Sequence, residues 1–146
     1  MSPENSKILT DKYPKIFPPP PPEENREPFY YFGFECGDGW FDLIELLCRN
    51  IQHHIDWGVE NLPEDKREEF QVTAAQVKEK FGSLRWYYNG GDEHIRGMVQ
   101  MAESMSNKIC ENCGDKATVK TKGWIRNLCQ PCCIRGNFKA QGFELK

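Results

Sequence analysis

Four cysteines near the C-terminal end constrain the fold of this chain more than any other feature. Cys110 and Cys113 form one C-x2-C pair, and Cys129 and Cys132 form a second pair after fifteen intervening residues. Two residues between cysteines allow a tight turn to direct both sulfurs at one ion, and this overall spacing is typical of zinc sites. Four thiolates complete a tetrahedral shell without an open position for water. The motif therefore predicts one structural Zn²⁺ in a C-terminal zinc ribbon.

Cys133 leaves a second ligand set open, because Cys129 and Cys133 form a C-x3-C pair. The two-residue spacing favours Cys132 as the fourth ligand. Between the cysteine pairs, residues 117–120 and 124–126 are expected to form a hairpin, which would bring the two pairs together. A segment this short cannot build a core of its own, so we expect metal binding to supply its folding energy.

Composition and length fit a small protein of a reducing compartment. The chain has 146 residues, of which 38% are hydrophobic and 12% aromatic, and this can support a modest core. It contains no apolar run long enough to span a membrane, and residues 1–17 contain no apolar signal-peptide core. We therefore expect a cytoplasmic protein in which the seven cysteines are metal ligands or buried thiols, not disulfides.

The first 28 residues are predicted to be a proline-rich arm, separate from an α+β body at 29–109 and the ribbon at 110–146. Residues 18–22 are five consecutive prolines, which favour a stiff polyproline II segment. The arm is interpreted either as a disordered spacer or as a peptide that docks on a partner or on the body. In the second case, three apolar side chains are the anchors: Tyr13, Ile16 and Phe17.

Two stripes of apolar side chains at helical spacing predict two helices in the body. The first helix is expected over residues 40–57, with Asp38, between two glycines, as its N-cap. The second helix is expected over residues 93–107, with Asp92 as its N-cap. Residues 60–69 are charged and predict a loop or a solvated helical turn.

Between these helices, alternating side chains predict a β-hairpin. Residues 83–88 alternate between apolar and polar faces, and they are expected to pair with residues 71–77 through a turn at 80–82. The aromatic segment at 29–34 predicts a short strand or an extended packing segment. Two helices packed on a small antiparallel hairpin sheet, followed by the zinc ribbon, define an α+β fold.

Charge is unevenly distributed, which raises nucleic-acid binding as an alternative function. Residues 1–109 contain 12 Lys/Arg against 19 Asp/Glu, whereas residues 110–146 contain 7 against 3. Zinc with four thiolates would add −2, so the ribbon stays only weakly positive, and an ordinary solvated surface explains it equally. The basic and stacking side chains of this alternative are Lys116, Lys120, Lys122, Arg126, Arg135, Lys139, Trp124 and Phe138.

Catalysis is the weaker alternative, and it rests on Cys36 beside Glu35 and Asp38. A nucleophilic cysteine needs a nearby base or a positive field, and these acidic neighbours would raise its pKa instead. A turn with a helix cap is the favoured interpretation. His53 and His54 point about 100° apart on the predicted helix, so they cannot easily chelate one ion together. We therefore predict no catalytic residues.

Five segments together resemble a family of small phage and prophage proteins: KYPKIF, FGFECGDGWFDLIELLC, QVKEKFGSLRWYY, CENCG and GWIRNLCQPC. The resemblance covers nearly the whole chain outside the proline run and residues 60–69. It implies a phage accessory protein that carries a pair of zinc knuckles, and it implies no particular activity. The proline run departs from the family pattern and leaves the role of the arm open.

The leading prediction is a non-enzymatic phage accessory protein that binds a macromolecule, first of all a protein of host or phage origin. Phage proteins of this size commonly redirect host machinery, so inhibition of a host defence or gene-expression system is the expected outcome. The residues leave the oligomeric state open. The candidate partner-binding residues are Tyr13, Ile16, Phe17, Trp40, Lys120, Lys122, Trp124 and Arg126.

Overall fold

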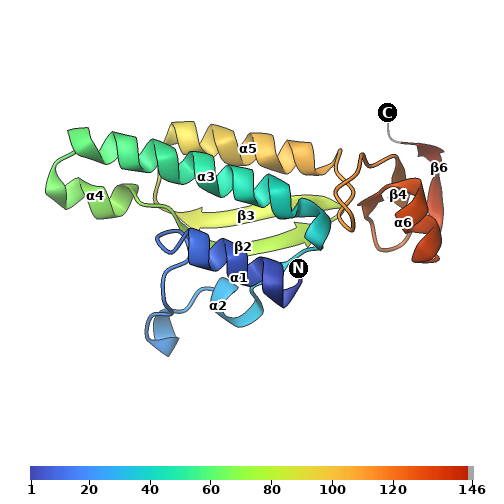
Figure 1. Cartoon of the computed structure of the whole chain (residues 1–146), viewed down its shortest axis with the longest axis horizontal. Helices are drawn as coiled ribbons and strands as arrows, with labels where there is room; N and C mark the ends of the chain where they lie inside the picture. Colours follow the sequence, from blue (N-terminus) through green and yellow to red (C-terminus); the bar gives the residue numbers. More distant parts are fainter. Residues whose placement is uncertain (145–146) are drawn as a thin grey trace.

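The computed structural model describes residues 1–144, with side chains described through residue 141. An elongated body and a small C-terminal ribbon lie next to each other along the long axis (Figure 1). The helices are α1 (Pro3–Lys12), α2 (Phe29–Phe32), α3 (Phe41–Gly58), α4 (Glu64–Phe70), α5 (Glu93–Ser106) and α6 (Gln130–Arg135), with 3-10 turns at Glu23–Asn25, Asp38–Trp40 and Val59–Asn61. The strands are β1 (Phe34–Glu35), β2 (Thr73–Lys80), β3 (Ser83–Asn89), β4 (Val119–Thr121), β5 (Asn127–Leu128) and β6 (Ala140–Glu144).

The body is built on a three-stranded sheet in the order β1-β2-β3. Strands β2 and β3 form the predicted antiparallel hairpin, in which Val77 lies opposite Trp86. The turn consists of Phe81 and Gly82, and both have positive φ (53° and 84°), as in the tight hairpin turns that match the twist of the strands. Strand β1 pairs parallel to β2, with Phe34 opposite Val77. The α+β prediction and the hairpin are confirmed.

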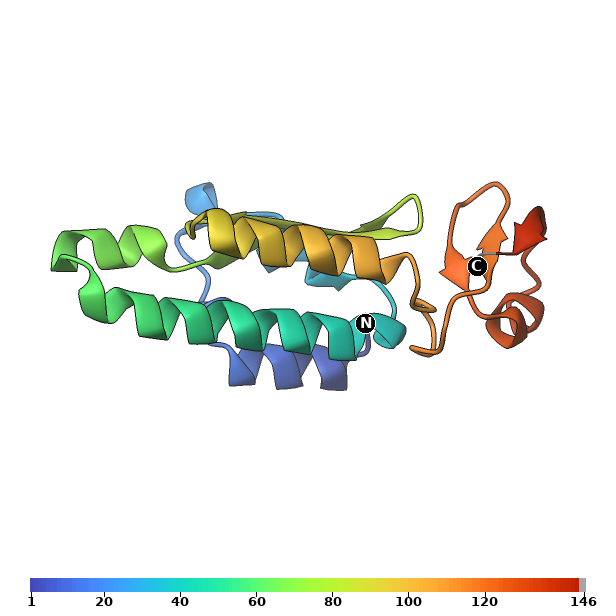
Figure 2. The ribbon, with the colours of Figure 1, turned by 90° about the horizontal axis from the view of Figure 1, so that it is seen from above.

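Helices α3 and α5 lie on one side of this hairpin (Figure 2). Both follow the predicted apolar stripes, and the Asp92 side chain caps α5 by accepting a hydrogen bond from the Ile95 N–H at 2.9 Å. Helix α5 also covers the outer edge of β3. There Ser106 Oγ accepts from the Leu84 N–H and Glu103 Oε1 accepts from the Trp86 N–H, so strand donors that would otherwise be unpaired are satisfied.

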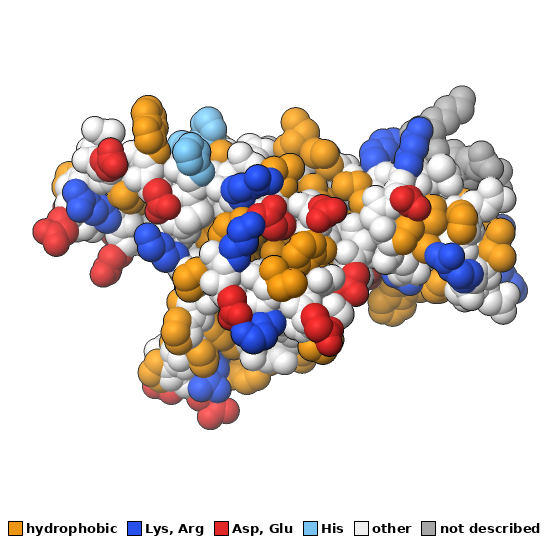
Figure 3. Space-filling view, viewed as in Figure 1, with side chains coloured by type: hydrophobic (Ala, Val, Ile, Leu, Met, Phe, Trp, Pro, Cys, Tyr) orange, Lys and Arg blue, Asp and Glu red, His pale blue; other side chains and the backbone are white. Residues whose placement is uncertain are grey.

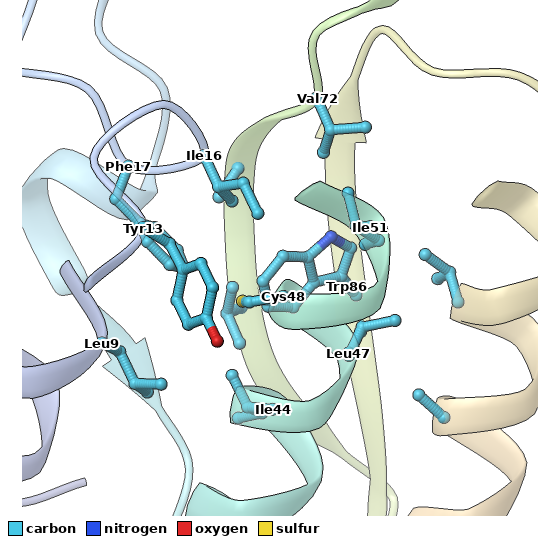
Figure 4. Close-up of a cluster of buried hydrophobic side chains, with 14 of the residues drawn as sticks. Leu9, Tyr13, Ile16, Phe17, Ile44, Leu47, Cys48, Ile51, Val72 and Trp86 are labelled. Carbon is cyan, nitrogen blue, oxygen red and sulfur yellow. The ribbon is translucent and has the colours of Figure 1, made fainter. Parts of the chain in front are cut away.

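The N-terminal segment is part of the body, so the predicted boundary at residue 28 is wrong. Four of its side chains are buried in the main core, against α3 and the sheet (Figure 4): Leu9, Tyr13, Ile16 and Phe17. The Ile16 carbonyl accepts from the Ala74 N–H at 2.9 Å, and the Tyr13 hydroxyl donates to Glu45 at 2.5 Å. Docking on the body, one of the two interpretations of this segment, is the one observed.

The proline run crosses the surface between this packed segment and α2. The Pro18 carbonyl accepts from the Tyr30 hydroxyl at 3.2 Å, and the Pro21 carbonyl accepts from Arg26 Nε at 2.9 Å. The prolines therefore connect two anchored parts of the body. Residues 60–69 follow their prediction, because the short helix α4 has no buried side chain.

Residues 29–39 differ from their prediction in two ways. The aromatic segment forms a helical turn, α2, before the strand β1 begins at Phe34. Asp38 does not cap α3. Its Oδ1 atom accepts from the Ser2 N–H at 2.7 Å and from Asn5 Nδ2 at 3.1 Å, because α1 begins beside this loop. The hydrogen bond from the Ser2 backbone is the main reason that the pKa of Asp38 is lowered.

Candidate metal centre

A second small sheet in the order β5-β4-β6 supports the ribbon. In its hairpin, Val119 pairs with Leu128, so the second strand begins later than the predicted 124–126. Residues 124–126 instead lie in the connecting loop. Thr121 closes this loop, because its hydroxyl donates to the Trp124 carbonyl at 2.6 Å and accepts from the Arg126 N–H at 2.8 Å. The hairpin prediction is correct in type and wrong in register.

The four predicted ligand sulfurs converge at the end of this sheet. The Sγ atoms of Cys110, Cys113, Cys129 and Cys132 all lie within 4.8 Å of one another. Cys113 Sγ and Cys129 Sγ are 3.6 Å apart. Thiolates placed tetrahedrally at about 2.3 Å from one ion are about 3.8 Å from each other, so the cluster has the dimensions of a metal site. Cys113 is exposed and the other three are buried.

Cys133 does not belong to the cluster. Adjacent residues of a helix point about 100° apart, so α6 directs Cys132 and Cys133 in different directions. The Cys133 Sγ lies 3.5 Å from the Phe138 carbonyl and donates to it. The choice that the sequence left open is therefore resolved in favour of Cys132.

The protein surrounds these sulfurs with hydrogen-bond donors. Burial alone would raise the pKa of the Cys110 thiol, but backbone N–H groups, first that of Cys129 and then that of Cys113, lower it below its usual value. Arg135 Nη2 donates to Cys132 Sγ at 3.0 Å, and this hydrogen bond raises the pKa of Arg135. Donors of this kind stabilise sulfur in its anionic, metal-binding form. Arg135 therefore supports the cluster, and it is not the free phosphate contact that the basic ribbon suggested.

The ribbon is fixed to the body through the buried side chain of Glu111, which is 5% exposed. Glu111 Oε1 accepts from the Gly37 N–H and Oε2 accepts from Arg126 Nε, each at 3.0 Å. The Glu111 carbonyl accepts from the Gly39 N–H at 2.8 Å. Trp40 Nε1 adds a hydrogen bond to the Ile109 carbonyl at 3.0 Å. The loop before α3 thus holds the first cysteine knuckle.

Glycine is required in this loop because the backbones approach closely. A Cβ atom at Gly37 would lie 2.3 Å from the Glu111 carbonyl oxygen, and one at Gly39 would lie 2.1 Å from the Cys110 carbonyl oxygen. Both distances are far below van der Waals contact. The sequence interpretation of CGDGW as a turn with a cap missed this role, although two glycines flanking one residue are a signal of close backbone contact.

Five of the eight candidate partner-binding residues have structural roles instead. Four of them are buried in the core: Tyr13, Ile16, Phe17 and Trp40, at 6%, 0%, 7% and 0% exposure. Arg126 pairs with Glu111 and lies 5.4 Å from the Phe138 ring. The four buried assignments are therefore wrong, because the core uses those side chains, whereas Arg126 is partly buried and takes part in anchoring the ribbon. Lys122 and Trp124 remain exposed, and Lys120 is half-buried.

The structure argues against a catalytic Cys36. Its side chain is 7% exposed, and burial raises the pKa of the thiol to about 12. His54, which the sequence predicted would not easily chelate an ion together with His53, contacts the start of α5 instead. His54 stacks on His94 with ring centroids 4.4 Å apart, and its Nε2 lies 2.9 Å from Asp92 Oδ2. The stacking is a contact between α3 and α5 that the spacing of His53 and His54 could not reveal.

The fold and the cysteine cluster define an α+β protein with four cysteines, clustered at the dimensions of a metal site, in a C-terminal ribbon. Comparison with protein-family models, with curated proteins and with solved structures finds no match to this chain. The resemblance to phage proteins thus stays a prediction.

Within the described residues, every helix is too short or too polar to cross a bilayer.

Proposed function

We propose that this chain is a non-enzymatic phage accessory protein that binds a protein of host or phage origin through the surface of α3 and α5. One structural zinc ion shapes its ribbon. Inhibition of a host defence or gene-expression system, in the host cytoplasm, is the outcome of binding that fits the resemblance to phage proteins.

The chemistry of the cysteine cluster supports zinc as the ion. Four thiolates at tetrahedral dimensions favour Zn²⁺ or an iron–sulfur centre over hard cations such as Mg²⁺, which prefer oxygen ligands. Two C-x2-C knuckles that close on one ion are typical of structural zinc. The closed shell supports a role in shaping a surface, because no position remains for a reacting water.

An apolar groove between α3 and α5 carries the proposal of protein binding. It has a volume of about 170 Å³ and is lined mainly by leucine and methionine, with Asn50 among them. Hydrophobic side chains come to the surface over these two helices in Figure 3. Three of them are strongly exposed: Leu46 at 43%, Met101 at 63% and Met105 at 44%. Methionine adapts to irregular partners, and a groove between helices fits the apolar face of an amphipathic helix.

Site-specific crosslinking tests the proposal. A photoreactive residue at Met101 should crosslink one protein in infected cells, whereas the same residue at exposed Lys66 on α4 should not. The Met101→Glu variant should keep its melting temperature, because the side chain is exposed, and should lose capture of that protein. Equal crosslinking from both positions, or undiminished capture by Met101→Glu, would contradict the proposal.

A further inference from the structure

Two exposed aromatic side chains face a cleft where the hairpin turn meets the ribbon. Phe81, in the turn between β2 and β3, is 70% exposed, and Trp124, in the loop between β4 and β5, is 74% exposed. They border a cavity of about 260 Å³ whose walls also include Lys78 and Lys80. Figure 2 shows the hairpin turn directed toward the ribbon. The cleft therefore lies away from the α3–α5 groove and is independent of it.

A bulky aromatic residue such as Phe81 is unfavourable at this position, because its backbone is strained and burial does little to offset that strain. Its φ of 53° lies in the left-handed region, which suits glycine or asparagine and is strained for a bulky residue. Its ring also gains little from burial. Backbone strain of this kind is concentrated at functional sites, where another use compensates for the lost stability.

Trp124 is held in place with most of its surface open. Its Nε1 atom donates to Glu79 Oε2 at 3.3 Å, and Glu79 Oε1 accepts from the Gly82 N–H at 2.9 Å. Glu79 is the only acidic residue among the described residues that line the cleft, and its carboxylate thus accepts hydrogen bonds from two donors. Asn127 Nδ2 donates to the Gly82 carbonyl at 3.0 Å and fixes the ribbon against the turn. The separation of the two aromatic rings therefore depends on an ordered ribbon.

Positive charge continues from the cleft across the face of the sheet that turns away from the core. Residues opposite each other in an antiparallel pair share a face, and Lys78 lies opposite Arg85. Lys80 and the half-exposed Tyr87 belong to the same face by alternation. Across the parallel pair, Glu35 shares this face, and its carboxylate accepts from Gln76 Nε2 at 3.0 Å.

The lysines near the cleft are not neutralised by carboxylates of the described residues, and Lys80 Nζ lies over the Phe81 ring, 5.9 Å from its centroid. In the part of the chain that the structure describes, Lys78, Lys80 and Lys122 form no ion pair with a carboxylate. The basic–aromatic surface is defined by six residues: Lys78, Lys80, Phe81, Arg85, Lys122 and Trp124.

We propose that the basic–aromatic surface binds single-stranded nucleic acid, with bases stacked on Phe81 and Trp124 and phosphates beside the four cations. Flat aromatic faces next to cations are the features with which proteins hold unpaired strands, because every base offers a π-face. Bases within a duplex do not expose these faces, so single strands are favoured. An acidic peptide could use the same cations, but cation pairing alone would not use the two exposed aromatic rings.

The test is fluorescence anisotropy of the zinc-loaded full-length chain with labelled oligo-dT and oligo-U of about 12 nucleotides. Binding should weaken as salt rises, with a slope of about −2 to −3 on a double logarithmic plot, for three to four phosphate contacts at about −0.7 each. Trp124→Ala should weaken binding by about 5-fold to 150-fold, from the stacking energy of one base. Trp57→Ala, at an equally exposed tryptophan on α3, should leave binding unchanged.

Phe81→Asn separates binding from folding. Asparagine tolerates positive φ, so this variant should be more stable than the wild type and yet bind the oligonucleotide more weakly. Three results would overturn the proposal. The first is absence of oligonucleotide binding at low salt, and the second is binding that Trp124→Ala and Phe81→Asn leave unchanged. The third is complete competition by polyglutamate for binding that does not depend on Trp124. Met101→Glu should retain oligonucleotide binding, so failure of the groove and failure of this surface are distinguishable.

Discussion

The body and the ribbon differ in what holds them together. In the body, α3, α5, the sheet and the N-terminal segment share one continuous core of large apolar side chains. In the ribbon, the buried cluster consists mainly of the cysteines themselves, with Val119 and Leu128 beside them. A core of that size cannot offset the conformational entropy of ordering the chain. We therefore expect folding of the ribbon, but not of the body, to need a metal ion at the cysteine cluster.

The contact between the two regions is polar and depends on backbone. Glu111, Asn127 and the glycines of the CGDGW loop form it, and hydrogen bonds rather than apolar burial dominate. Such a contact is specific in geometry but contributes modest free energy. A substitution that unfolds the ribbon is thus expected to leave the body folded, whereas a substitution that unfolds the body should also disorder the ribbon.

Loss of a metal ligand should have the largest effect. Structural zinc sites contribute about 10–16 kcal/mol of apparent binding free energy, which is folding energy for the ribbon. Cys110→Ser should therefore unfold residues 110–141 while the body keeps its cooperative melting transition. Limited proteolysis with mass analysis of the fragments measures this. A ribbon that stays resistant, or a body that unfolds with it, would contradict the division into two regions.

A buried side chain of the N-terminal segment should have the next largest effect. Ile16 is fully buried, so Ile16→Ala should lower the free energy of unfolding of the body by about 2–5 kcal/mol. Ile8 is 50% exposed, and Ile8→Ala should change the free energy of unfolding by only about 0.5 kcal/mol. Urea denaturation of both variants provides the comparison. Equal effects would restore the interpretation of this segment as an independent arm.

The contact between body and ribbon should be sensitive to one methyl group. Gly39→Ala places a Cβ against the Cys110 carbonyl and should destabilise the protein by about 1–3 kcal/mol. Gly97, inside α5, faces open space, so Gly97→Ala should stabilise by about 0.5–1 kcal/mol. Thermal denaturation should shift in opposite directions for the two variants. A shift in the same direction would show that the close approach at Gly39 is not maintained.

Acid should produce the smallest effect, through two carboxylates that hold the N-terminal segment. Hydrogen bonds lower the pKa of Asp38, chiefly from Ser2, and of Glu45, chiefly from Lys12 and then Tyr13. Because the folded pKa lies below the unfolded value, their stabilisation is complete above about pH 5 and is lost as pH falls through the folded pKa. Urea midpoints of wild type and Asp38→Asn should differ at neutral pH and converge in acid. A constant difference would exclude this linkage.

Features encoded in local pattern could be predicted from the sequence. The cysteine spacing identified the four sulfurs that converge, the apolar stripes identified α3 and α5, and alternation identified the β2–β3 hairpin. Each of these depends on residues close to one another in the chain, where helix and strand periodicity act directly.

Features that depend on distant contacts could not be predicted. Asp38 was assigned to the helix that follows it, but the start of α1 lies beside it and uses its carboxylate. The core position of Ile16 is set by pairing with β2, which lies more than fifty residues away in the chain. Neither of these partners is indicated by local sequence. The register of β5 was missed for a local reason: the Thr121 side chain closes the preceding loop, and strand alternation does not indicate such hydrogen bonds.

Native mass spectrometry of anaerobically purified protein is the sharpest test of a four-cysteine zinc site that excludes Cys133. The wild-type chain and Cys133→Ser should each carry one zinc ion, because Cys133 points to the Phe138 carbonyl and not to the cluster. Cys132→Ser should lose the ion. A wild-type chain without metal would contradict the zinc site. Retention of zinc by Cys132→Ser together with its loss in Cys133→Ser would contradict this set of four ligands.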